Sequence, residues 1–283
     1  MNRHELFRRM RKSKFFMVGA VMVILLAATA FLAPVLSPHD PLQINLRLRL
    51  NPPDFTSGWS EHPLGNDALG RDVLSRLLHG NTVSLQIAVT VVVLTFIIGT
   101  ILGVVAGFFG GVVDTVIMRI GDVQLSIPQL IFAIAIMAVL GGSMFNLIMV
   151  LVINGWVAFA RLVRSSVMMI RNTEYVNASR ALGASNIRIM FVQILPNVMT
   201  SLIIVTSQEF GRIILMEAGL SFIGLGVPPP APTWGGMIAQ GREYLATSPS
   251  VVLIPGIALM IAVFAFNFLG NGLRDVLDPK NKN

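Results

Sequence analysis

The charged side chains best placed for chemistry lie inside an apolar stretch, residues 197–218. This stretch contains Glu209, Arg212 and Glu217, and Gln208 adds a polar group beside them. An ionised group near the centre of a bilayer costs about 2.5–3.5 kcal/mol on insertion scales, so such groups normally face a protein interior, a partner or a water-filled path. Glu209 and Arg212 are one helical turn apart and can neutralise each other. The pattern therefore indicates either a transport path or subunit seam, or a structural ion pair.

The sequence patterns that would indicate an enzyme are missing. There is no cysteine and no Gly-x-x-x-x-Gly-Lys-Ser/Thr phosphate loop, and the lysines fall only near the chain ends, at Lys12, Lys14, Lys280 and Lys282. The histidines lie outside the apolar runs and include no His-Glu-x-x-His pair: His4, His39, His62 and His79. We therefore expect no catalytic residue, no metal and no cofactor in this chain.

Composition indicates which elements hold the charged residues. The chain has 283 residues, of which 54% are hydrophobic and 12% charged, whereas a soluble domain has about 25% charged residues. A helix needs about 20 mostly apolar residues to cross a bilayer. Runs close to that length cover residues 15–33, 84–109, 123–140, 144–160, 197–218 and 250–270. We predict an all-α membrane protein with six transmembrane helices.

The distribution of Lys and Arg predicts the orientation of these spans. With the N-terminus inside, fifteen of the 21 basic residues fall on the cytoplasmic side, five fall outside and Arg212 lies within the fifth span. Both termini are then cytoplasmic. The net charge of +7 reflects topology, so lipid rather than nucleic acid is the expected partner. A cleaved signal peptide ending near Ala28-Thr29-Ala30 is the alternative for the first span, although the run is longer than a usual signal.

These assignments divide the chain into five parts. They are a basic leader (1–14), the first span (15–33), an extracytoplasmic segment (34–83), a five-helix core (84–270) with a cytoplasmic loop at 161–196, and a tail (271–283). Within the extracytoplasmic segment, periodicity predicts a short amphipathic helix over 68–79. Leu69, Val73 and Leu77 would line one side, with the charged residues of the block facing away, namely Arg71, Asp72 and Arg76. Such a helix either packs on the membrane surface or contacts a partner.

A stripe of small residues marks the second span. Gly99, Gly103 and Gly107 recur every four residues and so share one helix face. Such a face lets another helix backbone approach closely. We expect these glycines to serve helix packing.

The cytoplasmic loop is too long for a simple turn, and its second part, residues 174–196, predicts two short helices that we call the elbow. In the first helix Tyr175, Ala178 and Leu182 share a face, and Gly183 can supply the left-handed residue that ends it. Ser185 is placed to cap the second helix. There an apolar stripe follows helical spacing, before Pro196: Ile187, Met190, Phe191 and Ile194. The elbow is either a docking element or an interfacial helix lying on headgroups.

At the elbow the sequence resembles the EAA loop of ABC importer permeases. Asn177-Ala178-Ser179 stands where the family has Glu-Ala-Ala, Gly183 has the family spacing, and Ile194-Leu195-Pro196 closes the motif. Two of the three opening residues therefore depart from the pattern, and a carboxylate is lost. Four further blocks resemble the dipeptide/oligopeptide/nickel branch: residues 62–76, 114–122, 220–228 with Trp234-Gly235, and 266–279.

The resemblance implies a MetI-like permease fold in a prokaryotic cytoplasmic membrane. It also implies a second similar permease, one or two ATPase subunits that hold ATP and Mg, and an extracytoplasmic binding protein as partners. Residues 177–183 would contact the ATPase, with Arg180 available for an ionic contact. The expected cargo is a di- or oligopeptide, with glutathione and nickel chelates as alternatives. A channel or secondary transporter that works without ATP is the alternative of another class.

Overall fold

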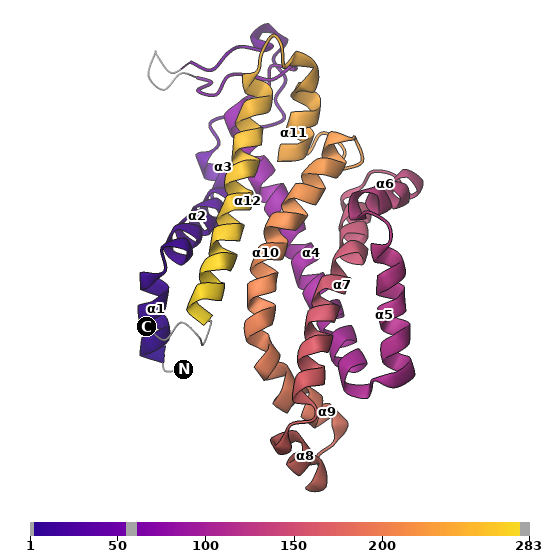
Figure 1. The fold of residues 1–283 in the computed structure, drawn as a ribbon. Helices are drawn as coiled ribbons and strands as arrows, with labels where there is room; N and C mark the ends of the chain where they lie inside the picture. Colours follow the sequence, from indigo (N-terminus) through magenta and orange to yellow (C-terminus); the bar gives the residue numbers. More distant parts are fainter. Residues whose placement is uncertain (1–2, 55–60, 278–283) are drawn as a thin grey trace.

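The computed structural model describes residues 3–54 and 61–277, and the regular structure in these ranges is helical. Figure 1 shows long helices side by side, with shorter ones at both ends of the bundle. In chain order the elements are α1 (Arg3–Lys12), α2 (Lys14–Phe31), α3 (Ala33–Leu36), η1 (Leu46–Leu48), α4 (Val73–Phe109), α5 (Gly111–Leu125), α6 (Gln129–Leu140), α7 (Met144–Ile170), α8 (Glu174–Ala181), α9 (Asn186–Arg188), η2 (Ile189–Ile194), α10 (Leu195–Phe222), α11 (Trp234–Gly241), η3 (Arg242–Tyr244) and α12 (Ser250–Leu277).

Five stretches in the described residues are long and apolar enough to cross a membrane. They are α2, α4, α7, the run Asn186–Phe222 that contains α10, and α12. The expected all-α membrane fold is confirmed.

The third predicted span, 123–140, is not one helix. It breaks at Ser126 to Pro128, and α5 and α6 meet there at 87°, so they make a sixth span only if the bent pair counts as one. Pro128 causes this break in two ways: its ring disfavours the helical conformation of Ile127, and its nitrogen has no hydrogen to donate.

Helices α4 and α7 approach closely along the glycine stripe. A Cβ added to Gly99 or Gly103 would lie only 2.5–2.6 Å from backbone oxygens of α7, and one on Gly107 would lie 2.8 Å from Val167 Cβ. These distances leave no space for a side chain, so the stripe faces α7 as a flat contact surface.

A second close approach joins α2 to α12, which lie side by side in Figure 1. A Cβ on Gly19 would lie 2.2 Å from the backbone nitrogen of Leu269, and one on Gly272 would lie 2.2 Å from that of Phe16. The contact ties the first span to the end of the core. Gly19 is a single glycine in its run, so no repeated spacing marks it in the sequence.

The two ends of the bundle differ. At one end the elbow projects between α7 and α10, and α1 and the last turns of α12 lie toward the same end (Figure 1). At the other end, residues 37–54 and 61–72 lie near α11 and η3. We call this second group the cap.

Candidate coupling elbow and buried polar residues

The elbow folds as two arms around a glycine turn. Gly183 has φ +82°, a conformation that side chains rarely adopt, and Ala184 N donates to Ser179 O across the turn at 3.0 Å. The side chain of Ser185 then accepts a hydrogen bond from Arg188 N at 3.4 Å, which caps the second arm. The turn is therefore fixed by backbone conformation and by one cap.

Buried side chains anchor the elbow to the bundle. Val176, Ile189 and Ile194 are fully buried in a cluster with residues of α4 and α7. Gln193 Nε2 donates to Ser179 Oγ at 2.8 Å and so joins the two arms. The guanidinium of Arg180 lies 5.3 Å from the centre of the Phe108 ring at the end of α4. These contacts make the elbow an extension of α4 and α7 rather than a loose loop.

The outer face of the elbow exposes four large apolar side chains among polar ones. Leu182 is 88% exposed and Ile187 69%, and Tyr175 and Phe191 are also exposed. Ala178 and Asn177 lie on the surface too, and Gly183 has no neighbouring atom within 4 Å of where a Cβ would stand. Large apolar side chains gathered at a protruding tip are typical of a protein-binding surface.

The second arm departs from the predicted stripe. Met190 and Ile194 are buried, but Ile187 and Phe191 point outward. Residues 189–194 form a π-helical turn, whose hydrogen bonds run from i to i+5, so the i, i+3, i+4 spacing no longer defines one face. Leu195 is half-buried and Pro196 lies in the first turn of α10, where a missing N–H costs nothing.

Inside α10, Arg212 is held by two partners. Its Nε donates to Glu209 Oε2 at 2.8 Å, and its Nη1 donates to Gln129 Oε1 at the start of α6, also at 2.8 Å. Glu209 is buried and Arg212 half-buried. The hydrogen bond from Arg212 to Gln129 therefore links the ion pair of α10 to the start of α6, next to the α5–α6 break. The side chain of Gln208 packs against α12 instead. A Cβ added to Gly270 of α12 would lie 2.9 Å from Gln208 Cγ.

Glu217 forms a separate polar site. It is fully buried and accepts a hydrogen bond from Ser221 Oγ at 2.7 Å, and Ser84 Oγ of α4 lies 3.5 Å away. The structure therefore does not bring together the three charged residues that the sequence grouped.

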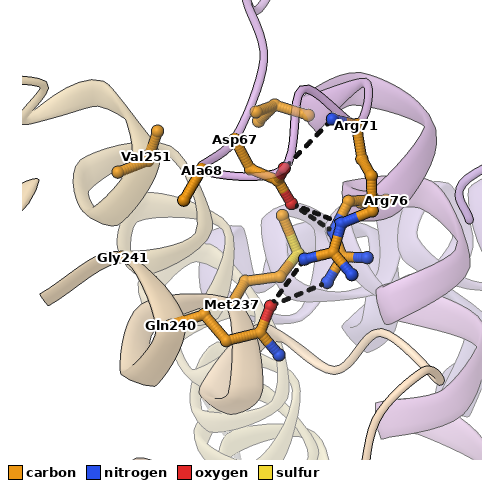
Figure 2. Close-up of a pocket in the computed structure, with 9 residues that line it drawn as sticks. Asp67, Ala68, Arg71, Arg76, Met237, Gln240, Gly241 and Val251 are labelled. Atoms are coloured by element: carbon orange, nitrogen blue, oxygen red, sulfur yellow. Dashed lines mark hydrogen bonds and ion pairs between the residues drawn. The ribbon is translucent and has the colours of Figure 1, made fainter. Parts of the chain in front are cut away.

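The cap holds a charged cluster that overturns the prediction for 68–79 (Figure 2). Asp67 Oδ2 lies 2.7 Å from Arg71 Nε and 3.3 Å from Arg76 Nε, and Gln240 of α11 accepts from Arg71 and Arg76 at 2.9 and 3.2 Å. No separate amphipathic helix forms, because α4 begins at Val73 and continues into the second span.

The charged side of this block is buried, contrary to the prediction, although Val73 is buried and Leu77 packs against the core as expected. Arg76 is 1% exposed and Arg71 and Asp72 are buried, whereas Leu69 is 40% exposed. The cause is tertiary: α11 covers the charged side of α4 and supplies Gln240 as the polar partner.

Comparison with known sequences identifies the family. The sequence model of the family described as "Binding-protein-dependent transport system inner membrane component" matches residues 99–283. The chain belongs to this family. A second model, the N-terminal transmembrane domain of oligopeptide transport permease C, matches residues 3–53 of this inner membrane component.

Relatives of this inner membrane component match along nearly its whole length. It is 41% identical over 280 residues to the di/tripeptide transport system permease protein DppC of Pseudomonas aeruginosa, covering 99% of this chain and 92% of the relative. It is 39% identical both to the glutathione permease GsiD of Pectobacterium atrosepticum (98% and 91% covered) and to the oligopeptide permease OppC of Bacillus subtilis (96% and 88%). The expected family is confirmed.

A solved structure shares the fold of this inner membrane component. A chain of the inward-facing MetNI methionine ABC transporter superposes with a TM-score of 0.58 at 21% identity, covering 72% of this chain and 97% of that one. The expected MetI-like fold is confirmed.

Proposed function

We propose that this inner membrane component is a permease subunit of an ABC importer for di- or oligopeptides. The relatives named for dipeptide, di/tripeptide and oligopeptide transport support a peptide cargo, and the glutathione permease supports a small peptide-like molecule more generally. ATP and Mg would be bound by separate ATPase subunits, and this chain would carry no catalytic activity of its own.

The observation that supports this function best is the elbow: an exposed apolar tip on a firmly anchored base. The tip (Tyr175, Leu182, Ile187 and Phe191) is suited to an apolar groove on an ATPase subunit. The base packs on α4 and α7 and continues into α10. A displacement of the tip by ATP binding would therefore move α7 and α10 as rigid elements, which is the requirement for alternating access.

The proposed arrangement in the membrane follows from this role. The elbow faces the cytoplasm, together with both termini, and the cap faces outward, where a solute-binding protein would dock. A second, similar permease would lie beside this one, with the path between them. Residues 177–183 would form the ATPase contact, although Arg180 is already engaged with Phe108 on this chain.

The Glu209–Arg212–Gln129 group is proposed to border the path. Arg212 stays half-buried although it is paired, so part of its charge is open to a neighbour or to water. Charged groups at membrane depth normally face such a route or a partner. Gln208 and Glu217 are placed against α12 and α4 instead, which favours a packing role for them.

The proposal is tested by co-purification. The ATPase, permease and binding-protein subunits of the same transporter are expressed with this chain, and Leu182→Asp is compared with Leu245→Asp, an exposed leucine beyond η3 at the cap. We expect the ATPase subunits to be lost with Leu182→Asp and retained with Leu245→Asp, while the second permease remains in both. Equal recovery of the ATPase with both variants would contradict the elbow assignment. A chain that purifies alone and conducts solute without ATP would contradict the importer itself.

A further inference from the structure

A cluster of two histidines and one carboxylate lies in the cap, away from the elbow and the buried charges of α10. His39 follows α3, His62 follows the undescribed residues 55–60, and Asp72 is the N-cap of α4. One ring nitrogen of each histidine and one oxygen of Asp72 lie within 4.8 Å of one another. Three segments of the chain therefore bring their potential ligands to one point.

Backbone and side-chain contacts already fix this arrangement. His62 Nδ1 lies 3.0 Å from Asp72 Oδ1. The other carboxylate oxygen, Asp72 Oδ2, accepts from Ser75 N at 2.7 Å and from Ser75 Oγ at 2.6 Å. His39 N in turn donates to Ser75 Oγ at 3.1 Å, and the two imidazole rings are 4.4 Å apart. The first turn of α4 thus positions all three residues.

We propose that His39, His62 and Asp72 bind one divalent transition-metal ion of the zinc type. Imidazole nitrogen with one carboxylate oxygen is a donor set that Zn²⁺, Co²⁺ and Ni²⁺ accept, whereas Mg²⁺ and Ca²⁺ prefer oxygen alone. Zinc–ligand bonds are about 2.0–2.2 Å, so two ligands of one tetrahedral ion lie about 3.3 Å apart. The separation of His62 Nδ1 and Asp72 Oδ1 is already close to that value.

Binding would replace the proton shared by His62 and Asp72 with the ion. The ring of His62 then carries its one proton on Nε2 instead of Nδ1, by exchange with solvent, so that it stays neutral while Nδ1 offers its lone pair to the ion. His39 would turn toward the ion by a side-chain rotation, which replaces its present contact, Nε2 to the backbone oxygen of Glu61 at 2.7 Å.

The surroundings favour a cation. The three residues border an open hollow of about 240 Å³ whose described lining includes Asp40 and Glu61 but no Lys or Arg. With neutral histidines this lining is negative, and the hollow has room for water molecules to complete the coordination. The ion would clamp the segments around His39 and His62 onto the start of α4. This site does not depend on the proposed transport function, because its test measures ion binding and thermal stability and not uptake.

The test uses the full chain in detergent, purified with a tag that contains no histidine. After incubation with Zn²⁺ and dialysis, metal content is measured by mass spectrometry, and Co²⁺ titration followed by visible absorption reports the coordination. We expect one ion per chain, an affinity about 100-fold lower or more in His39→Ala and in His62→Ala, and no loss in His79→Ala. His79 is the control histidine, because it lies on α4 outside the cluster and has its own partner, Ser75 O at 3.0 Å.

Folding is checked by the melting temperature without metal. His39→Ala removes a half-buried side chain that contacts the backbone oxygen of Glu61 and the ring of His62, so we expect a small fall in this temperature without loss of the fold. Zn²⁺ should raise the melting temperature of the native chain and of His79→Ala, but not of His39→Ala. Absence of bound ion in the native chain, or equal binding and equal stabilisation in His39→Ala, would overturn the proposal.

Discussion

Arg164 of α7 binds Asp114 of α5 through two nitrogens. Its Nε contacts Asp114 Oδ1, and its Nη2 lies 2.6 Å from Asp114 Oδ2. One turn earlier on α7, Arg161 Nη2 lies 2.6 Å from Asp122 of α5. The two pairs fasten α5 along α7, the helix that leads directly into the elbow (Figure 1).

Breaking the two-point pair should loosen α5 from α7. Asp114→Asn removes the negative charge and is expected to cost about 1 kcal/mol of unfolding free energy, because the pair is partly open to solvent. Unfolding in mixed micelles with rising SDS measures the loss. Exchanging the charges, with Asp114→Arg and Arg164→Asp together, should recover part of it. A double variant no better than the sum of the two single variants would show that the pair contributes nothing.

The same alanine substitution should have opposite effects at two helical glycines. Gly103→Ala places a Cβ 2.6 Å from Ala160 O, so α4 and α7 must separate, at a cost of about 1–3 kcal/mol. Gly256→Ala in α12 meets no atom within 4 Å and should be neutral or stabilise by up to about 1 kcal/mol. The measurement is SDS unfolding of both proteins. Equal stability of the two variants would contradict the close packing of α4 on α7.

Gly183→Val tests the elbow turn. The residue sits at φ +82° with open space around it, so valine strains the backbone by about 1–2 kcal/mol without a clash. We expect the complex to assemble but ATP hydrolysis to run without uptake. Gly141→Val is the control, because that glycine has φ +78°, also with open space, at the end of α6 away from the elbow. Uncoupling of the same size in both variants would show that strain anywhere is enough.

Glu209→Ala tests the buried pair in α10. The substitution leaves Arg212 with Gln129 as its remaining described side-chain partner, so we expect uptake to fall at least about tenfold while membrane insertion is unchanged. Glu209→Gln should retain part of the activity, since its amide oxygen can still accept from Arg212. Unchanged uptake in Glu209→Ala would contradict the proposal that this pair borders the transport path.

Local features of the sequence predict most of the fold. Apolar runs locate the long helices, because a segment in lipid must be apolar and must satisfy its backbone hydrogen bonds within itself. Gly183 and Ser185 mark the elbow turn, because a left-handed glycine and a helix cap act on neighbouring residues only. Pro128, which causes the break between α5 and α6, can be seen in the sequence. The length of the apolar run alone does not indicate the break. A proline inside a predicted span is the signal that could have located it.

The contacts of the cap depend on residues far apart in the chain. Arg76 is buried because Gln240, 164 positions later, meets it. His39 and His62 lie close together because both contact the first turn of α4, and because His39 Nε2 lies 2.7 Å from the backbone oxygen of Glu61. Hydrophobic periodicity describes one helix without its neighbours, so it predicts that the charged side of residues 68–79 faces away from the protein. Long-range partners of this kind need the tertiary structure.

Transport in a defined system tests the central claim most directly. The chain is reconstituted with its neighbouring permease, ATPase subunits and binding protein in liposomes, and uptake of a radiolabelled dipeptide is measured with ATP and with a non-hydrolysable analogue. We expect uptake that requires ATP hydrolysis and is lost with Leu182→Asp. Uptake that proceeds equally without ATP, or that survives Leu182→Asp unchanged, would contradict the account.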